Sequence, residues 1–322
     1  MAIKTPGQLG SILYARESTY GVTPTFASSE VGFRTFGRMR TLDTTDDPGA
    51  DTIQSDGFRT LSHVIFTQRE CGFSAELSLV DNNAGGVSSA VHLLSMALGG
   101  YVDEIEINNQ NDLPSFSAVI RIASDQWFLA KGCKIDNLTF SADGVGKQIR
   151  AKIDVICRDM SEQKESRAAL GFTGMPGTAA DGGPPATYKQ YPRVLGLPDM
   201  PVWMDVPASS FELKISNNLT TKEGFDVNPT TGATGPALKA GSGIVPGNIG
   251  MELSLSVMST SKFWDTLKRN GTSPFIAELS LSKTVLELRG CYLPGNDQPS
   301  RSHDVYDESI TIIARDVSVY KK

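Results

Sequence analysis

Residues 73–80 read FSAELSLV and residues 249–257 read IGMELSLSV, so one short pattern occurs twice in this chain of 322 residues. Both stretches alternate apolar with polar residues, which is typical of a β-strand that buries one face. Placing Glu76 on Glu252 aligns the apolar positions of the two stretches. The repetition predicts that a β-rich unit is present in two copies.

Three further segments repeat in the same order. The two hairpin patterns, for example, both finish with a basic residue, a glycine and a cysteine, at 131–133 and 289–291. The order strand, helix, hairpin, strand predicts a mainly β fold with α, in which each of two tandem copies carries one flanking helix. The repeated segments are helices at 87–100 and 259–271, hairpins at 116–133 and 275–291, and last strands at 148–161 and 305–318.

The composition indicates how the chain is divided. Residues 161–204 are rich in Gly, Pro, Ala and Thr, which favours a linker. We therefore expect an N-terminal arm over 1–30, a first domain over 31–160 and a second domain over 205–322. Each copy also contains a long polar insertion, at roughly 43–71 and 221–247, and loops of this length are usually functional or disordered.

Charge and hydropathy exclude several functions. The net charge is −6, whereas a protein that grips nucleic acid by its phosphates is expected to be basic. No apolar run approaches the roughly 20 residues that a membrane-crossing helix needs, and the N-terminus lacks the apolar stretch of a signal peptide. We expect a protein made in the cytoplasm, without membrane insertion and without direct grip on DNA.

Catalytic and metal-binding patterns are incomplete, so we expect no enzyme, no cofactor and no metal. The histidines lack ligand spacing, the Ser-x-x-Lys and Gly-x-Gly-Lys matches lack their companion motifs, and the acidic stretch lacks EF-hand spacing. The scattered cysteines are expected to be buried thiols, with no bridge between Cys133 and Cys291. The residues considered are His63, His92, His303, Ser259–Lys262, Gly144–Lys147, Asp43–Asp51, Cys71, Cys133, Cys157 and Cys291.

Three stretches resemble the tail tube proteins of long-tailed bacteriophages. They are ARESTYGVTP at 15–24, SFELKISNNLTTKEGF at 210–225 and VPGNIGMELSLSV at 245–257. The resemblance implies a β-sandwich or half-barrel flanked by a helix, with a long loop that reaches the neighbouring subunit. Members with two such domains form trimeric rings that imitate a hexamer, and the rings stack into a tube that conducts DNA during ejection. The chain departs from the family pattern where residues 82–86 and 101–114 lengthen the first copy.

The resemblance also implies partners and a location. The partners would be other copies of the chain and other tail proteins, such as the tape measure, the tail terminator and the baseplate or tip. The location would be the tail of the virion, after assembly in the host cytoplasm. A baseplate hub or a head–tail connector of related fold is the alternative, and a carbohydrate-binding β-sandwich is a more distant one.

The polar face of the first repeated strand supplies candidate lumen-lining residues. Hydroxyls and carboxylates would give a hydrated surface that repels phosphate, so that DNA slides past without releasing counterions. The candidates are Ser74, Glu76 and Ser78 in the first copy and Glu252, Ser254 and Ser256 in the second.

Overall fold

The computed structural model describes most of the predicted strands and one helix. The described residues are 11–24, 34–47, 50–53, 63–66, 70–81, 88–100, 105–106, 113–121, 127–163, 184–196, 202–222, 243–258, 274–294 and 307–321. Their structure is mainly β, as the alternation predicts. The expected second helix, at 259–271, lies outside the described residues.

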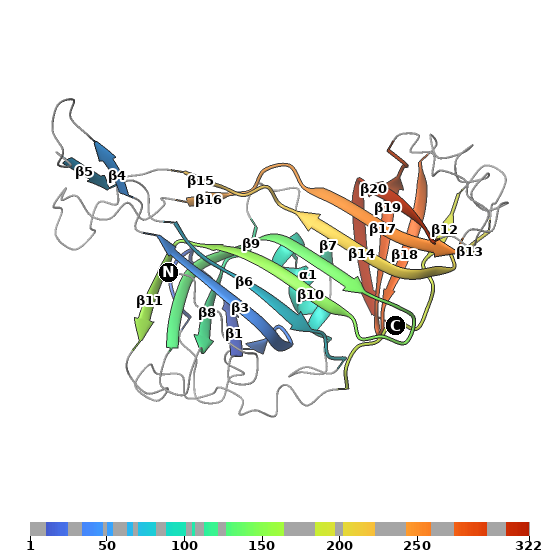
Figure 1. The fold of residues 1–322 in the computed structure, drawn as a ribbon, viewed down its shortest axis with the longest axis horizontal. Coiled ribbons are helices and arrows are strands. Elements are labelled where there is room, and N and C mark those ends of the chain that lie inside the picture. The colour runs from blue at the N-terminus through green and yellow to red at the C-terminus, as the bar shows by residue number, and fades with distance from the viewer. Residues whose placement is uncertain are drawn as a thin grey trace.

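One antiparallel sheet runs the length of the molecule and is called the long sheet here (Figure 1). Its strand order is β3-β6-β10-β9-β14-β17-β20, and every neighbouring pair is antiparallel. It joins strands from both halves of the chain because β9 pairs with β10 on one side and with β14 on the other. The strands are β3 (Arg38–Asp47), β6 (Glu70–Ser78), β9 (Trp127–Ala142), β10 (Arg150–Cys157), β14 (Ala208–Ser216), β17 (Gly250–Met258) and β20 (Asp307–Ala314).

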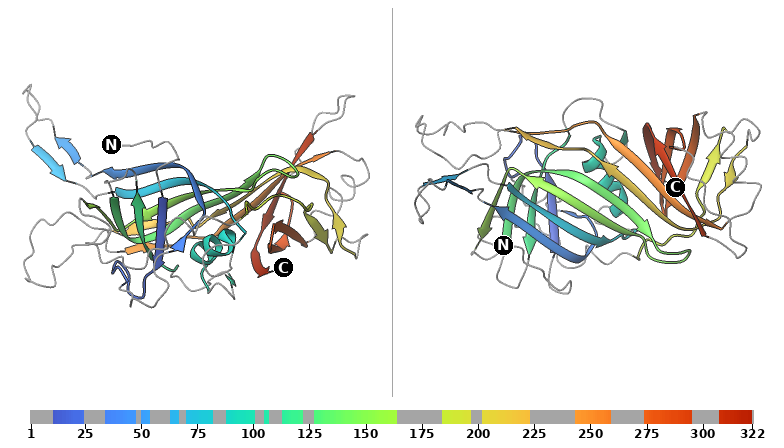
Figure 2. Two further views of the ribbon diagram at one scale, coloured as in Figure 1. Left: turned by 90° about the horizontal axis from the view of Figure 1, so that it is seen from below. Right: turned by 45° about the horizontal axis from the view of Figure 1, so that its top comes forward.

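Two shorter sheets cover the apolar side of the long sheet, one under each half (Figure 2). The first short sheet has the order β2-β1-β8-β9-β11 and shares β9 with the long sheet. The second has the order β13-β12-β18-β19-β21-β7. Their remaining strands are β1 (Ser11–Arg16), β2 (Arg34–Thr35), β7 (Ile105–Glu106), β8 (Phe116–Arg121), β11 (Asp159–Gln163), β12 (Arg193–Leu195), β13 (Met204–Asp205), β18 (Phe275–Leu281), β19 (Thr284–Cys291) and β21 (Asp316–Lys321).

Helix α1 (Ser89–Leu98) lies between the two short sheets and is buried along its whole length. Ser88 precedes it in an extended conformation, and Gly99 ends it with a φ of 95°, a conformation that glycine adopts readily. Within the helix, the buried His92 ring meets the Tyr14 hydroxyl at 2.7 Å. One hydrophobic core therefore continues from the first half of the chain into the second.

Two hairpins project from the long sheet as arms. The β15–β16 arm joins Thr220–Lys222 to Gly243–Val245 and follows β14, whereas the β4–β5 arm joins Ala50–Ile53 to His63–Phe66 and follows β3. Figure 1 shows both arms directed toward the same end of the molecule. The β15–β16 arm lies beside the first half, while the β4–β5 arm extends beyond it (Figure 1).

Several boundaries differ from the sequence-based expectation. The acidic stretch expected as a loop is part of β3 as far as Asp47, because Thr44 and Leu42 bury one face against the core. The expected N-terminal arm contains β1, which pairs with β8. The expected linker contains β12, and Tyr188 within it is fully buried and donates a hydrogen bond to the Ala208 carbonyl at 3.0 Å.

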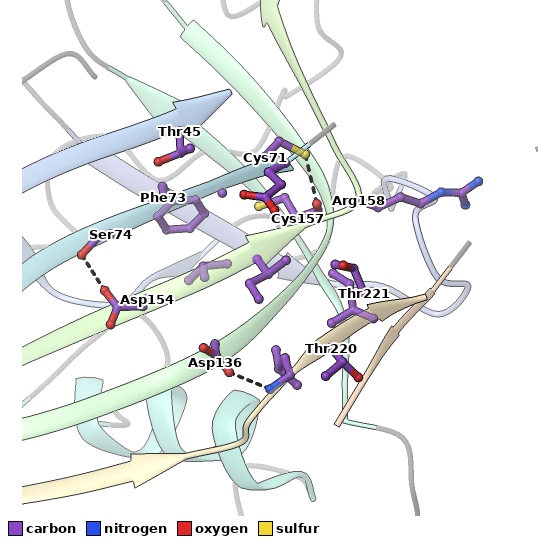
Figure 3. A pocket seen from close by; sticks show the side chains of 16 residues that line it. Thr45, Cys71, Phe73, Ser74, Asp136, Asp154, Cys157, Arg158, Thr220 and Thr221 are labelled. Carbon is purple, nitrogen blue, oxygen red and sulfur yellow. Dashed lines mark hydrogen bonds between the residues drawn. The ribbon is translucent and has the colours of Figure 1, made fainter. Parts of the chain in front are cut away.

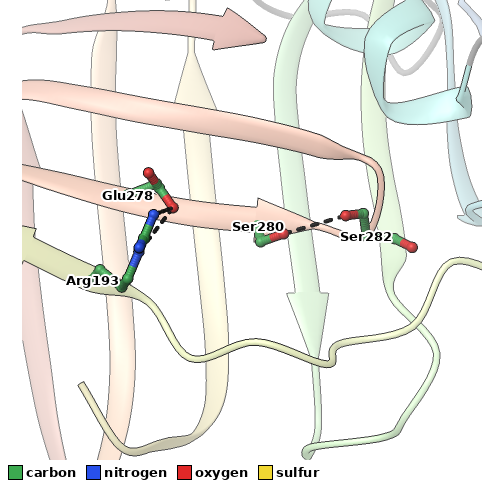
Figure 4. Close-up of polar contacts among 4 residues, drawn as sticks. All are labelled: Arg193, Glu278, Ser280 and Ser282. Atoms are coloured by element: carbon green, nitrogen blue, oxygen red, sulfur yellow. Dashed lines mark hydrogen bonds and ion pairs between the residues drawn. The ribbon is translucent and has the colours of Figure 1, made fainter. Parts of the chain in front are cut away.

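Polar contacts fix β12 and the β18–β19 turn of the second short sheet. Arg193 of β12 donates from Nε to the Glu278 carboxylate of β18 at 3.1 Å, and Figure 4 shows the pair side by side. At the two-residue turn between β18 and β19, Ser282 donates to the Asp81 carboxylate at 2.8 Å. That contact ties the turn of the second half to the first half.

The pairing order is the same in both halves. In the first half β6 lies between β3 and β10, and in the second half β17 lies between β14 and β20. The register, however, does not fit two of the expected matches at once. Matching the last strands, 148–161 with 305–318, places Ile156 on Ile313. Because Gly72 pairs with Ile156 and Glu252 pairs with Ile313, that match puts Glu252 at the place of Gly72, four residues away from Glu76.

Candidate functional site

The polar face of the long sheet carries all six candidate lining residues. Ser74, Glu76 and Ser78 lie on β6, and Glu252, Ser254 and Ser256 lie on β17, where they alternate with buried apolar residues. Ser78 is itself buried, with 6% of its surface exposed. Three other strands separate β6 from β17. Residues that pair from one strand to the next nevertheless form rows across the sheet, and each row contains residues of both strands. The polar face is therefore one surface that both halves share.

The central row contains both glutamates. Glu76 pairs with Lys152, Lys152 with Thr139, Thr139 with Lys214, and Lys214 with Glu252. The next row contains Ser78 and Ser254, joined through Arg150, Ser141 and Glu212. A third row joins Asp43, Ser74, Asp154, Asn137 and Ser216, and the Ser74 hydroxyl donates to the Asp154 carboxylate at 2.7 Å.

Basic side chains lie beside the glutamates, whereas the sequence predicted a lining of serines and glutamates alone. Glu76 lies 3.8 Å from the Arg40 guanidinium and 3.9 Å from that of Arg150. Glu252 lies directly opposite Lys214. The expected surface of hydroxyls and carboxylates is thus a charge-balanced one, because both signs alternate across the strands. The alternation of Arg150, Lys152 and Asp154 with apolar residues in β10 was the signal in the sequence for this.

A junction between the two halves lies at one end of this face. Lys134 of β9 is 4% exposed, donates from Nζ to the Ile244 carbonyl of the β15–β16 arm at 3.0 Å, and lies 5.5 Å from the centre of the Tyr20 ring. The Arg158 guanidinium lies 5.7 Å from the same ring. Burial raises the pKa of Tyr20 to about 12, so its hydroxyl remains protonated at neutral pH.

The segment 15–24 builds the floor of this junction. Glu17 is 8% exposed, and its carboxylate accepts hydrogen bonds from the Gly132 amide at 2.9 Å, the Gly21 amide at 2.7 Å and the Ser117 hydroxyl at 2.7 Å. A buried carboxylate is tolerated when donors satisfy it in this way. The turn that presents Tyr20 to the arm is therefore fixed from below.

Asn217 fastens the base of the arm. Its buried side-chain amide donates to the Ala97 carbonyl at 2.9 Å and to the Ile135 carbonyl at 2.8 Å, and its backbone amide donates to the Asp136 carbonyl at 2.8 Å. Ala97 belongs to the last turn of α1, where carbonyls lack partners within the helix. One asparagine thus joins the second half to both α1 and β9.

A pocket of about 660 Å³ opens between the arm and the polar face (Figure 3). Its walls come from β3, β6, β9 and β10 in the first half and from β15 and β16 in the second. The Asp136 carboxylate in its wall accepts the Leu219 amide at 2.8 Å. The pocket is part of the junction, because both halves of the chain line it.

The family comparison gives this architecture its context. The family model for phage tail tube proteins matches residues 7–286, from the segment before β1 into β19. The chain belongs to the phage tail tube protein family. A search of curated proteins found no match to the chain.

For a tail tube protein, the features above are structural elements of a virion tail. The family is one of structural proteins rather than a known enzyme family. Among the described residues, no group of three or more His, Cys, Asp or Glu side chains is placed to hold a metal ion. None of the helices within the described ranges is long and apolar enough to span a bilayer.

His92 is a core residue of this tail tube protein, and Gly144–Lys147 is the turn between β9 and β10. His63 has its side chain outside the described set, and His303 and Ser259–Lys262 lie outside the described residues.

Proposed function

We propose that three copies of this tail tube protein close into a ring, and that stacked rings form a tube whose lumen conducts DNA. The observation that carries the proposal is the long sheet, which passes from one half of the chain to the other without interruption through the β9·β14 ladder. Its two outermost strands, β3 and β20, each pair with a single strand among the described strands, and on the outer side of β20 the bridge of Ile313 to Tyr292 is the one further pairing within the described ranges. Open edges of this kind favour pairing with further chains, and repetition about an axis closes them.

The proposal treats the chain as two copies of one tube domain. The matching strand order supports this, and so does the pair of glycines that precede Cys133 and Cys291, with φ values of 60° and 59°. Each half would then supply one sixth of the ring, which gives three chains an approximate six-fold symmetry. The other virion roles considered above, a hub or a connector, would use the same domain in a single ring.

The polar face of the long sheet is the proposed lumen lining, with Glu76 and Glu252 in one row across its strands. Because basic and acidic side chains neutralise one another there, the face would attract DNA phosphates only weakly, and its arginines would already be paired with carboxylates. Weak net charge and hydroxyl-rich strands would let DNA pass with few counterion-releasing contacts. The arms would reach neighbouring domains, and the tail would contain other tail proteins above and below the tube.

Cryo-electron microscopy of tubes assembled from the purified full-length chain tests the proposal. We expect stacked rings of three chains with the polar face of the long sheet turned inward. Rings of six chains would overturn the stoichiometry, and an outward-facing long sheet would overturn the lumen assignment. Single closed rings that never stack would favour a hub or connector instead.

A further inference from the structure

Lys134 is buried between the Tyr20 ring of its own half and the arm of the other half. Its ammonium group donates to the Ile244 carbonyl, and its exposed fraction is 4%. An ammonium group taken out of water is costly unless it is hydrogen-bonded, so the arm and the lysine depend on each other. The contact shows, within one chain, how an arm of one half packs on the other half.

Tyr292 holds the place of Lys134 in the second half. Lys134 pairs with Ile156 and Tyr292 pairs with Ile313, and each follows the glycine of positive φ by two residues. The neighbouring backbone contact is also the same: the amide of Arg158 donates to the Lys131 carbonyl at 3.0 Å, and that of Arg315 to the Arg289 carbonyl at 3.1 Å. Yet Tyr292 is 37% exposed.

The β4–β5 arm occupies the matching place in the first half, because it follows β3 as the β15–β16 arm follows β14. Its two strands pair only with each other among the described strands. An isolated two-stranded hairpin is marginally stable in water. Its strand sequences include Ile53 and Val64–Phe66, residue types that favour burial.

Both arms point toward the same end of the molecule (Figures 1 and 2). The β15–β16 arm therefore lies over the half that precedes its own along the sheet, and the β4–β5 arm, on the first half, extends past the described strands of its own chain (Figure 1). In a head-to-tail ring the domain preceding the first half belongs to another chain and is its second half.

We infer that the exposed Tyr292 is the docking site for the β4–β5 arm of a second copy of this chain. The inference rests on the proposed ring but adds the residues at which its chains meet. A tyrosine in place of Lys134 gives this site a broad aromatic surface, which suits an arm with an apolar strand and which cannot reproduce the ammonium–carbonyl contact. The two arm sites therefore differ in chemistry, so each would take its own arm and fix the order of halves around the ring.

Site-specific photocrosslinking of the assembled full-length chain tests the inference. With p-benzoylphenylalanine at position 292, we expect a product of two chains whose crosslinked peptide lies within 50–66. The same probe at Tyr191, which is 45% exposed, is the surface control and should not give that product. Tubes that form normally but crosslink from position 292 to any other segment would overturn the inference and leave the proposed function standing.

A substitution pair provides the second measurement. Tyr292→Ala should raise the chain concentration needed for assembly by roughly ten-fold, equivalent to about 1.4 kcal/mol, while Tyr292→Phe and Tyr191→Ala leave it nearly unchanged. Because Tyr292 is 37% exposed, Tyr292→Ala also removes some buried surface from the unassembled chain, so assembly should be compared at a temperature well below the thermal midpoint of every variant. Unchanged assembly of Tyr292→Ala would refute the docking site, whereas failure of the unaltered chain to assemble under any condition would refute the proposed function as well.

Discussion

Gly132 is pressed against Arg158, such that a Cβ atom on the glycine would lie 2.7 Å from the arginine Cβ. Gly132 also has a φ of 60°, which costs other residues about 1–2 kcal/mol. Gly132→Ala should therefore lower the stability of the chain by more than this conformational cost alone. Calorimetric melting of the unassembled chain would measure the loss.

Gly290 is the matched control for that substitution. Its φ is 59°, but an added Cβ would lie 3.3 Å from the Arg315 Cβ. Gly290→Ala should cost close to the conformational term alone, about 1–2 kcal/mol. Equal melting temperatures for the two variants would contradict the tighter packing assigned to Gly132.

Glu76 is expected to act on DNA passage through the arginines beside it. Replacing Glu76 and Glu252 with lysine would remove the carboxylate beside Arg40 and Arg150, leave Asp143 as the acidic partner of Arg150 at 3.0 Å, and turn the face basic. Phage carrying both changes should eject DNA more slowly at low salt, and the difference should shrink as salt rises, because phosphate contacts release counterions. Single-particle ejection kinetics would measure this.

Asp205→Lys makes the same charge reversal as either one of the two glutamate replacements, at an exposed position of the second short sheet. It should leave ejection kinetics near those of the unaltered phage. If the two-glutamate variant also ejects at the unaltered rate at low salt, the polar face does not line the lumen.

Asn217→Ala should loosen the two halves from each other. It removes both hydrogen bonds to the Ala97 and Ile135 carbonyls and leaves these buried acceptors without that donor, a loss of about 1–3 kcal/mol. Hydrogen exchange should accelerate along the β15–β16 arm and at the end of α1. Asn218→Gly is the control, since glycine keeps the φ of 47° and only an exposed contact to the Asn248 carbonyl is lost. Equal exchange in both variants would show that Asn217 does not hold the arm.

The cysteines are expected to resist alkylation in the native protein. All four are buried, and burial together with the Cys157 thiol raises the pKa of Cys133, so little thiolate forms near neutral pH. Iodoacetamide should label them only after denaturation. Mass mapping without reductant should give no Cys133–Cys291 bridge, because the Cys133 sulfur contacts that of Cys157, at 2.8 Å, in its own half. Finding that bridge would contradict the assignment of these two residues to separate domains.

The sequence predicts the elements better than their partners. Alternation over 73–80 and 249–257 locates β6 and β17, and the helical spacing of 87–100 with Gly99 after it locates α1, because these patterns depend on near neighbours. The four-residue displacement between Glu76 and Glu252 escapes this reasoning. A shift by an even number keeps every side chain on its own face, so alternation cannot detect it.

The polar face shows the same limit. Its glutamates and serines follow from the alternation within single strands. The arginines beside Glu76, by contrast, come from β3 and β10, which meet β6 only in the folded sheet. The sequence does not predict the junction either, because Lys134 and Ile244 are 110 residues apart and neither belongs to a recognisable motif.

The passage of β9 from one half to the other has an evolutionary consequence. Where β9 pairs with β14, the two sides of a domain contact are encoded in one gene and inherited together, so a change on one side is always tested against the same partner. Contacts between separate chains have no such guarantee in a host infected by two related phages, where subunits of different origin mix. Natural variation should therefore be freer at the β9·β14 boundary, where compensating changes stay linked, than at the surfaces by which one chain meets the next.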